Sequence, residues 1–388
     1  MTTADELVDG SGRSTARIVE LRELRLPLVT PFRTSSGAQT SRRILLVRAA
    51  VERDGVVTEG WGECVAGDEP TYTSEYVDGA ALVMANVLVP RLHAVSDLRA
   101  TDVATVLAPV RGHPMAKAAL EMAVLDAELR AQGTSFAALV GATRDRVPSG
   151  VSVGIHPTID DLLAAVQGYV EEGYARVKLK IEPGRDIEPV AAVRDLVGPD
   201  LPLQVDANAA YTRQDTAHLG RLDAFDLLLI EQPLPEDDLL GHAALARALA
   251  TPVCLDESIV SEAVCADAIE LGAAEVVNLK AGRVGGYLAA RRIHDLCVRH
   301  GVPVWCGGML ETGIGRAANA ALAALPGFTL PGDISASRRF WARDIVTEPI
   351  EVVDGHVAVP TGPGFGATLD LDVVASVTTA VTPFGPPR

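Results

Sequence analysis

Five short apolar runs decide the fold of this chain: VKLK (177–180), LQVD (203–206), LLLIE (227–231), VCLD (253–256) and VVNLK (276–280). Each run ends in a polar residue, and successive end residues are 26, 25, 25 and 24 positions apart. Short runs of mostly branched apolar residues are typical of buried parallel strands. The segments between them have helical spacing, for example YLAARRIHDLCVRH (287–300). This alternation predicts a series of βαβ units.

The same spacing continues on both sides of this stretch. VSVGI (151–155) precedes it, and PVWCGG (303–308) and FTLPGD (328–333) follow it. Eight parallel strands are the number in a (β/α)₈ barrel, so we predict this α/β fold. A doubly wound open sheet is the alternative, but such sheets normally have a glycine-rich phosphate turn after their first strand. VSVGIHPTID (151–160) supplies no such turn.

The rest of the chain predicts a second domain. Its 388 residues exceed one barrel of roughly 250 residues. Residues 18–65 alternate between apolar and polar, which predicts an antiparallel meander, and residues 76–132 have helical spacing up to Gly133. We therefore predict an α+β capping domain over 17–140, the barrel over 145–336, and a C-terminal segment, 337–388, that packs back on the capping domain.

Composition and charge exclude several classes of function. The formal charge of −17 at pH 7 argues against a nucleic-acid partner, which requires concentrated Lys and Arg, but not against a metal ion or a small anionic substrate. Five scattered cysteines without a CxxC pair argue against disulfides and zinc, and indicate a cytoplasmic protein. Residues 1–16 lack the apolar core of a signal peptide and are predicted to be disordered. No apolar run approaches 18 residues, so no membrane span is expected.

Three of the five end residues are carboxylates on consecutive strands, namely Asp206, Glu231 and Asp256. Catalytic groups of parallel barrels lie at the carboxyl ends of the strands, and neighbouring strands are about 4.8 Å apart. The three side chains can therefore converge on one ion. Oxygen ligands without His or Cys suit Mg²⁺ or Mn²⁺ and not zinc. The alternative is that each carboxylate only caps the helix that follows it.

The other two end residues are lysines, Lys180 and Lys280, on the second and sixth strands. These strands lie opposite each other in an eight-stranded barrel, and Lys178 lies on the same side of its strand as Lys180. Removing a proton α to a carboxylate requires a base and a cation that stabilises the enediolate. One amine on each face of the α-carbon favours racemisation or epimerisation, whereas use of one amine allows syn elimination. Alternatively, each lysine is an ordinary ion-pair partner.

These motifs resemble those of the enolase superfamily, muconate-lactonizing subgroup, over about residues 19–364. The matching motifs are KLK (178–180), DAN (206–208), EQP (231–233), LDES (255–258) and NLK (278–280). Longer stretches resemble the N-acylamino acid racemases of that subgroup, which act on N-succinylamino acids and often have o-succinylbenzoate synthase activity. These stretches are PFRTS (31–35), GWGEC (60–64), GRVGGYLAARR (282–292) and the segment 306–337.

The resemblance implies an enzyme in which Lys180 and Lys280 are the acid/base catalysts. It implies that Asp206, Glu231 and Asp256 bind Mg²⁺, with Mn²⁺ or Co²⁺ as substitutes. Residues with implied supporting roles are Lys178, Asn208, Glu257 and Arg283. Residues that resemble the lining of the N-acyl pocket are Ser152, Gly308, Met309 and Leu310. Residues that resemble apolar contacts from the capping loops are Phe32, Tyr72 and Phe340.

Two further segments bear on the substrate. Dipeptide epimerases carry Asp-x-Asp at the end of the eighth strand to hold a free ammonium, whereas GDIS (332–335) has one Asp. A small carboxylate with a neutral N-acyl nitrogen is therefore favoured. The loop GDEP (67–70) is acidic for a lid over an apolar chain, which leaves the preferred amino-acid side chain open. The resemblance further implies a homo-oligomer, an octamer.

Four other functions stay open at this point. Dehydration to o-succinylbenzoate could be the physiological reaction, and muconate-type cycloisomerisation uses the same residues. A Schiff-base lyase is an alternative from another class, since barrel lysines also form imines. The last alternative is a metal-binding barrel without catalysis.

Overall fold

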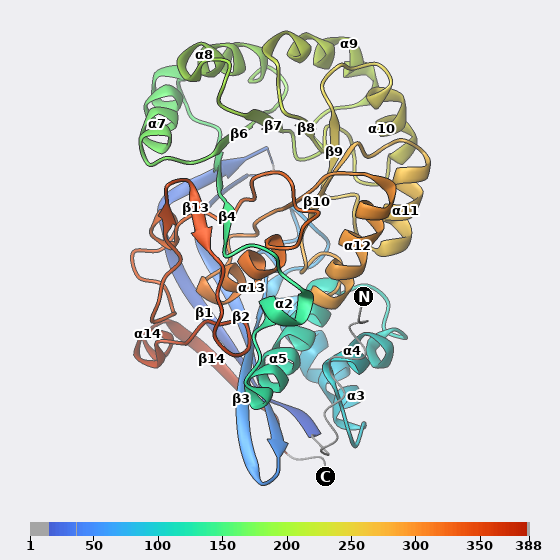
Figure 1. Ribbon diagram of the computed structural model, residues 1–388, viewed down its shortest axis with the longest axis vertical. Helices are drawn as coiled ribbons and strands as arrows, with labels where there is room; N and C mark the ends of the chain where they lie inside the picture. Colours follow the sequence, from blue (N-terminus) through green and yellow to red (C-terminus); the bar gives the residue numbers. More distant parts are fainter. Residues whose placement is uncertain (1–14, 36, 386–388) are drawn as a thin grey trace.

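The computed structural model describes residues 15–35 and 37–385. Figure 1 shows a ring of strands and helices in one half of the molecule and a block of long strands with packed helices in the other. The N-terminal segment predicted to be disordered lies outside the described residues, except for Thr15 and Ala16. Those two residues begin strand β1 (Thr15–Thr34), in which they pair with β2.

The predicted barrel is confirmed by a sheet of seven parallel strands in the order β11-β10-β9-β8-β7-β6-β5. The strands are β5 (Gly150–Val153), β6 (Arg176–Lys180), β7 (Leu203–Asp206), β8 (Ile230–Glu231), β9 (Val253–Leu255), β10 (Val276–Leu279) and β11 (Val304–Cys306). The connecting helices are α7 (Ile159–Glu171), α8 (Ile187–Val197), α9 (Thr216–Leu219), α10 (Leu239–Ala246), α11 (Glu262–Glu270), α12 (Tyr287–His300) and α13 (Gly313–Ala323). In Figure 1, helices α7 to α12 lie along the outside of the arc of strands.

The predicted eighth strand, 328–333, is not a regular strand. It closes the ring through two single parallel bridges, between Val304 and Phe328 and between Ser149 and Gly332. The segment contains Pro331, which has no N–H to donate to a ladder. The prediction of eight regular strands was therefore wrong at this position, although the segment occupies the place of the eighth strand.

The capping domain begins with the predicted antiparallel meander of β1, β2 (Gly37–Arg53) and β3 (Val56–Cys64). Its helical part comprises α2 (Val77–Val83), a π turn (Met84–Leu88), α3 (Val89–His93), α4 (Ala100–Leu107), α5 (Pro114–Gln132) and α6 (Phe136–Val140). The helical spacing up to Gly133 predicted α5, and the helix is buried on nearly all sides between the meander and the barrel. Gly60 and Gly62 of β3 allow this approach, because a Cβ at either position would lie 2.1 Å from the α5 backbone.

The C-terminal segment contacts both parts of the molecule. Strand β12 (Val352–Val353) pairs with β13 (His356–Ala358), and β13 pairs with β4 (Arg146–Pro148), which leads into the barrel. After α14 (Leu371–Val377), strand β14 (Thr378–Pro383) pairs antiparallel with β1 of the capping domain. The last strand therefore completes the sheet that the N-terminal residues begin.

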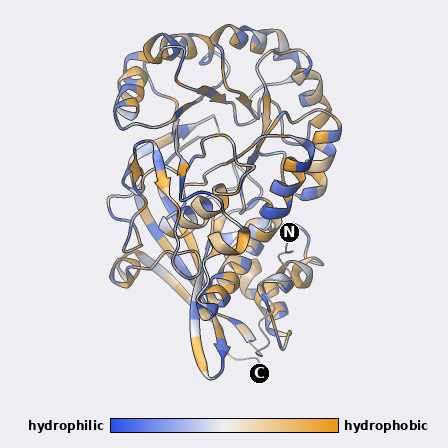
Figure 2. Cartoon of the chain, in the orientation of Figure 1, coloured by the Kyte–Doolittle hydropathy of each residue, from blue (hydrophilic) through white to orange (hydrophobic). Residues whose placement is uncertain are grey.

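The outer helices mix hydrophilic and hydrophobic residues along their length, as Figure 2 shows. This pattern is expected of helices that pack one face on a sheet and present the other to solvent. Over residues 15–35 and 37–385, none of the helices combines the length and apolar character needed to cross a membrane.

Two buried glutamates of the capping domain cap helices of the barrel. Glu63 in β3 accepts hydrogen bonds from the main-chain N–H of Thr312 (3.0 Å) and of Gly315 (3.0 Å), at the start of α13. Glu121 in α5 accepts one from the N–H of Leu288 (3.0 Å), at the start of α12. The first N–H groups of a helix have no partner within the helix, and carboxylates suit its N-terminus. The capping domain is thereby fixed to the two helices that follow β10 and β11.

These two glutamates predict how stability depends on pH. Burial raises the pKa of Glu63 and of Glu121 to about 7, above the ordinary value of about 4.3. The folded protein thus holds the protons of Glu63 and Glu121 more tightly than the unfolded chain does. The contribution of these two groups to the free energy of unfolding is therefore fully present below about pH 4 and is lost as the pH rises through about 7. Urea denaturation at a series of pH values should show this loss, and the Glu63→Gln/Glu121→Gln variant should show less of it.

The matched control for this measurement is Glu59→Gln, since Glu59 lies on the same strand as Glu63 and its side chain is 47% exposed. That variant should keep the pH dependence of the wild type. If the double variant also kept it, the buried glutamates would not be its source.

Candidate active site

The five predicted residues lie together at the carboxyl ends of five adjacent strands. Lys180, Asp206 and Glu231 are the last residues of β6, β7 and β8. Asp256 and Lys280 directly follow β9 and β10. The pairing register places Lys180 beside Asp206, and Asp206 beside Glu231. The spacing read from the sequence therefore corresponds to one contiguous group of side chains.

Lys178 is the most enclosed cation of this group. Its Nζ lies 3.1 Å from Asp206, 3.0 Å from Glu231 and 2.6 Å from Asp333, and 4.8 Å from the centre of the Trp305 ring. Burial opposes its charge, yet the three carboxylates raise the pKa of Lys178 well above its ordinary value. Lys178 thus holds two predicted metal ligands and the end of the eighth segment in one network.

Lys180, at the end of β6, contacts the carboxylate of Asp206 as well. Its Nζ lies 2.5 Å from Oδ2 of Asp206 and donates to Oδ1 of Asn208 at 2.7 Å. Nδ2 of Asn208 donates in turn to Glu257 at 2.8 Å. Asn208 has a φ of +44°, a conformation that Asn tolerates better than most residues. Asn208 and Glu257 therefore hold Lys180 in place, and their supporting roles in catalysis stay a prediction.

Lys280 belongs to a separate group around Asp256. Its Nζ donates to Oδ2 of Asp256 at 2.7 Å and to the hydroxyl of Tyr72 at 2.9 Å. Arg283 donates to Oδ1 of Asp256 and to the same hydroxyl. Burial opposes the charge of Asp256, but Arg283 and Lys280 lower the pKa of this carboxyl. The prediction that Tyr72 is an apolar contact was wrong, because its hydroxyl lies among charged groups.

Several contacts of the site were not predicted from the sequence. Asn278 donates to Oε1 of Glu231 at 2.7 Å, and a Cβ at Gly307 would lie 2.5 Å from Cε of Lys280. Asn278 lies two positions before Lys280, as Lys178 does before Lys180, so the two-residue period of a strand could have identified it. Tyr72 and Asp333 were noted in the sequence for other reasons, but no comparable signal predicts their contacts with Lys280 and Lys178, which arise from the folding of distant segments.

The site is strongly charged and its charged side chains are buried. Burial and repulsion from Asp206 raise the pKa of Glu231 well above its ordinary value, although Lys178 opposes this. Burial and Asp256 raise the pKa of Glu257 to about 7. Three of the four lysines in the chain lie here, and the fourth, Lys117, donates to the main-chain oxygen of Val110. Buried charge of both signs at such density is typical of a functional site.

The donor set of Asp206, Glu231 and Asp256 fits a hard divalent cation. The carboxylates are almost fully buried on consecutive strands, and no imidazole or thiolate forms part of the set. Their oxygens point to lysine, arginine and asparagine groups, and within residues 15–35 and 37–385 no three acidic, His or Cys side chains stand in the arrangement of a formed metal centre. The assignment of these three residues to a metal stays a prediction.

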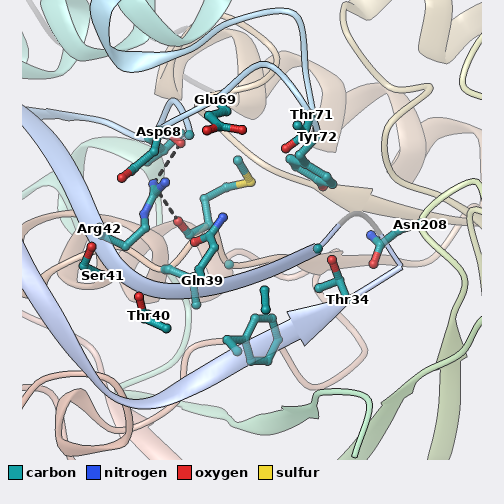
Figure 3. Close-up of a pocket in the computed structure, with 18 of the residues that line it drawn as sticks. Thr34, Gln39, Thr40, Ser41, Arg42, Asp68, Glu69, Thr71, Tyr72 and Asn208 are labelled. Carbon is teal, nitrogen blue, oxygen red and sulfur yellow. Dashed lines mark hydrogen bonds between the residues drawn. The ribbon is translucent and has the colours of Figure 1, made fainter.

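A cavity of about 400 Å³ opens in front of Lys180 and Lys280, between the barrel and the loops of the capping domain. Figure 3 shows its polar side, with Gln39, Asp68 and Glu69 around it and Tyr72 and Asn208 at one end. Predicted substrate residues that line this cavity are Phe32, Tyr72, Gly308, Met309 and Leu310. The acidic loop noted in the sequence thus forms part of the wall.

A second cavity of about 70 Å³ is lined by both lysines as well, on the side of β5 and the C-terminal segment. Predicted substrate residues that line it are Phe32, Ser152, Gly308, Leu310 and Phe340. All seven predicted substrate residues therefore border one of two cavities that share the lysines.

The loop between β11 and α13 is held in a strained conformation. Leu310 has a φ of +57°, which costs a non-glycine residue about 1–2 kcal/mol. Arg42 of the capping domain donates to the carbonyl of Met309 at 3.2 Å, and Arg316 donates to the carbonyl of Glu311 at 2.8 Å. Contacts on both sides of Leu310 thus hold this loop, whose Gly308 and Leu310 border both cavities.

Comparison with known proteins places this architecture in a family. The mandelate racemase / muconate lactonizing enzyme N-terminal domain model matches residues 16–141, and the enolase C-terminal domain-like model matches residues 161–373. Together they cover the capping domain and the barrel from α7 onward.

Curated relatives and a solved structure agree with these models. An N-succinylamino acid racemase from Amycolatopsis sp is 61% identical over 362 residues, which are 93% of this chain and 97% of that protein. An o-succinylbenzoate synthase from Geobacillus kaustophilus is 46% identical over 91% of this chain and 93% of that protein. The crystal structure of an enolase superfamily member from Listeria innocua superimposes with a TM-score of 0.90 at 41% identity, covering 95% of this chain and 99% of that one. The chain therefore belongs to the enolase superfamily, with the N- and C-terminal domains of its mandelate racemase and muconate lactonizing enzyme group.

Proposed function

We propose that this protein racemises N-acyl amino acids, N-succinyl ones in particular, by removing and returning the α-proton with two lysines. The observation that carries the proposal is that Lys180 and Lys280 reach the same cavities from β6 and β10, which lie on opposite sides of the ring. An α-carbon between them is approached by one amine on each face. The relative from Amycolatopsis, whose name states this activity, supports the proposal.

The two lysines have separate hydrogen-bond partners, as two independent acid/base groups require. Lys180 donates hydrogen bonds to Asp206 and Asn208, and Lys280 donates hydrogen bonds to Asp256 and Tyr72. Proton transfer by a positioned side chain contributes typically 10²- to 10⁴-fold to a rate. In one direction Lys180 takes the α-proton and Lys280 delivers a proton to the other face; in the opposite direction the roles exchange.

Members of this superfamily use a divalent metal, and their sites pair a Lys or His base with Mg²⁺. We infer Mg²⁺ for this chain, with Mn²⁺ or Co²⁺ as substitutes, held by Asp206, Glu231 and Asp256. When bound, the ion would stabilise the negative charge that the substrate carboxylate gains on loss of the α-proton.

Dehydration to o-succinylbenzoate is the second candidate activity. It is favoured by the relative from Geobacillus kaustophilus, whose name states it. Elimination requires one lysine as a base and the other only as a cation. Lys280 suits the role of such a cation, because it forms an ion pair with Asp256, to which Arg283 is also paired.

The experiment that tests the proposal is exchange of the α-proton of N-succinylphenylalanine in D₂O, followed by NMR. With Mg²⁺ we expect both enantiomers to exchange and to interconvert, and after treatment with a chelator we expect neither. Exchange that persists without a metal, together with trapping of a lysine imine by borohydride, would support a Schiff-base lyase instead. Absence of exchange with every N-acyl amino acid would refute the proposal.

We also propose that the protein acts in the cytoplasm as a homo-oligomer, an octamer by family resemblance. All five cysteines are free thiols in the structure, which supports a reducing compartment. The substrate is a small carboxylate, and the net charge of −17 argues against nucleic acid as a further partner.

A further inference from the structure

We propose that Asp333 is a positioning residue for metal binding, because it holds the ammonium group of Lys178 back from two of the carboxylates assigned to the ion. Those two carboxylates are Asp206 and Glu231. This inference rests on the proposed function, in which they bind Mg²⁺ together with a third carboxylate. It gives a part in metal affinity to a residue outside that set, on the segment that closes the barrel.

Lys178 occupies oxygens of both carboxylates. Its Nζ lies 3.1 Å from Oδ2 of Asp206 and 3.0 Å from Oε2 of Glu231. Oδ1 of Asp206 accepts from the main-chain N–H of Asn208 at 3.0 Å. Oε1 of Glu231 accepts from the side chain of Asn278 at 2.7 Å. How easily a cation reaches Oδ2 and Oε2 therefore depends on how firmly Lys178 holds them.

Asp333 is the carboxylate that lies nearest to the same ammonium group. Its Oδ2 is 2.6 Å from Nζ of Lys178. Burial opposes the charge of Asp333, but Lys178 and Arg176 lower the pKa of this carboxyl, so its side chain is an anion. The three protons of the ammonium are thus shared among three carboxylates. Without Asp333, the positive charge of Lys178 would be left to the two metal ligands.

Lys178 is enclosed, so it cannot exchange Asp333 for water. The residue is 2% exposed, and its Nζ lies 4.8 Å from the centre of the Trp305 ring. Over residues 15–35 and 37–385, its ion pairs are with Asp206, Glu231 and Asp333 alone. A buried charge that loses a partner is costly. The ammonium would therefore tighten its contacts with the remaining two carboxylates, in competition with the metal.

The closing segment of the barrel fixes Asp333 in this position. The main-chain N–H of Asp333 donates to the carbonyl of Cys306 in β11 at 2.9 Å. Arg176 in β6 donates to the carbonyl of Pro331 at 2.8 Å. The guanidinium of Arg176 also lies 2.9 Å from Oδ1 of Asp333, which leaves Oδ2 to Lys178. The segment that replaces a regular eighth strand thus supplies a fixed anion to the ring.

The test is a double-mutant cycle in which the dissociation constant of Mg²⁺ is measured by isothermal titration. The four proteins are the wild type, Asp333→Asn, Lys178→Met and the double variant, and circular dichroism checks that each is folded. We expect Asp333→Asn to weaken Mg²⁺ binding about 10- to 100-fold, the cost of losing a group that supports metal ligands. In the Lys178→Met background, the same substitution should change the affinity by less than about 2-fold, as for uncoupled sites, because no ammonium remains to be released.

Arg176→Met is the matched control. It removes the other cation paired with Asp333 but leaves the contact with Lys178, so it should not weaken Mg²⁺ binding. If Asp333→Asn does not fold, Arg176→Met/Asp333→Asn replaces it, with Arg176→Met as the reference, because removal of both partners leaves no uncompensated guanidinium.

The proposal is overturned if Asp333→Asn binds Mg²⁺ as tightly as the wild type. It is also overturned if the substitution weakens binding equally in the wild type and in the Lys178→Met background, as a general distortion of the site or the direct loss of a negative charge would do. A wild type that binds no Mg²⁺ would refute the metal assignment and this inference with it. If no N-acyl amino acid were racemised, the proposed function would fail, but the expected coupling in Mg²⁺ affinity would still support the role of Asp333.

Discussion

Lys280→Met should abolish racemisation while α-proton exchange survives for one enantiomer only. Methionine keeps the bulk of the lysine stem but carries no proton. Lys180, on the opposite side of the ring, keeps its contacts with Asp206 and Asn208 and still removes the proton on its own face. The proton then returns to the same face, which gives exchange without inversion. Racemisation should fall by about 10²- to 10⁴-fold or more, the contribution of a positioned acid/base group.

Lys180→Met should give the mirror result, with exchange confined to the other enantiomer. The measurement is NMR exchange in D₂O for each N-succinylphenylalanine enantiomer, with chiral chromatography of the product. Lys117→Met is the matched control, because Lys117 is the remaining lysine of the chain and lies in α5, where it donates to the main-chain oxygen of Val110. If either active-site variant still exchanged both enantiomers, the assignment of one lysine to each face would be wrong.

Asp256→Asn should remove both metal binding and activity. Asp256 accepts from Lys280, Arg283 and Tyr72, so the substitution takes a charge from the centre of the site. Substitution of groups that only support a ligand costs 10- to 100-fold in metal affinity, and a ligand itself should cost more than about 100-fold. At 100 times its dissociation constant, Mg²⁺ should stabilise the wild type by about 2.7 kcal/mol. Thermal unfolding with and without Mg²⁺ should show this gain in the wild type and not in Asp256→Asn.

Asp267→Asn serves as the control for that experiment, since Asp267 is an exposed residue of α11 and should leave the Mg²⁺ effect unchanged. An equal Mg²⁺ effect in Asp256→Asn and wild type would show that the ion binds elsewhere. The assignment of the three carboxylates would then fail, even if the protein required Mg²⁺ for activity.

The fold and the centre of the site could be predicted because both depend on local periodicity. A strand ends where its apolar run ends, and parallel strands bring their carboxyl ends together, so Lys180 and Asp206 become neighbours although they are 26 positions apart. The irregularity of the eighth strand could also have been predicted from the sequence. Pro331 interrupts the predicted run, and the missing N–H weakens any ladder there.

The contacts between distant segments could not be predicted in this way. Tyr72 reaches Lys280 from a capping loop, and Glu63 reaches Thr312 across the domain boundary. The spacing of these residues in the sequence does not predict the two contacts, because the contacts depend on how the two domains pack. For the same reason the spacing in α5 predicts a helix but not that the helix is enclosed on nearly all sides.

The distribution of lysine gives the protein an unusual chemical property. Three of its four lysines line or adjoin the active site, and all other cationic side chains except those of histidine are arginines. Amine-selective reagents such as formaldehyde with a mild hydride donor therefore meet few competing side chains outside the site. The extent of methylation at Lys180 and Lys280, measured by mass spectrometry, should fall as a ligand fills the cavities. Ligand occupancy can therefore be measured on the native chain without an added label.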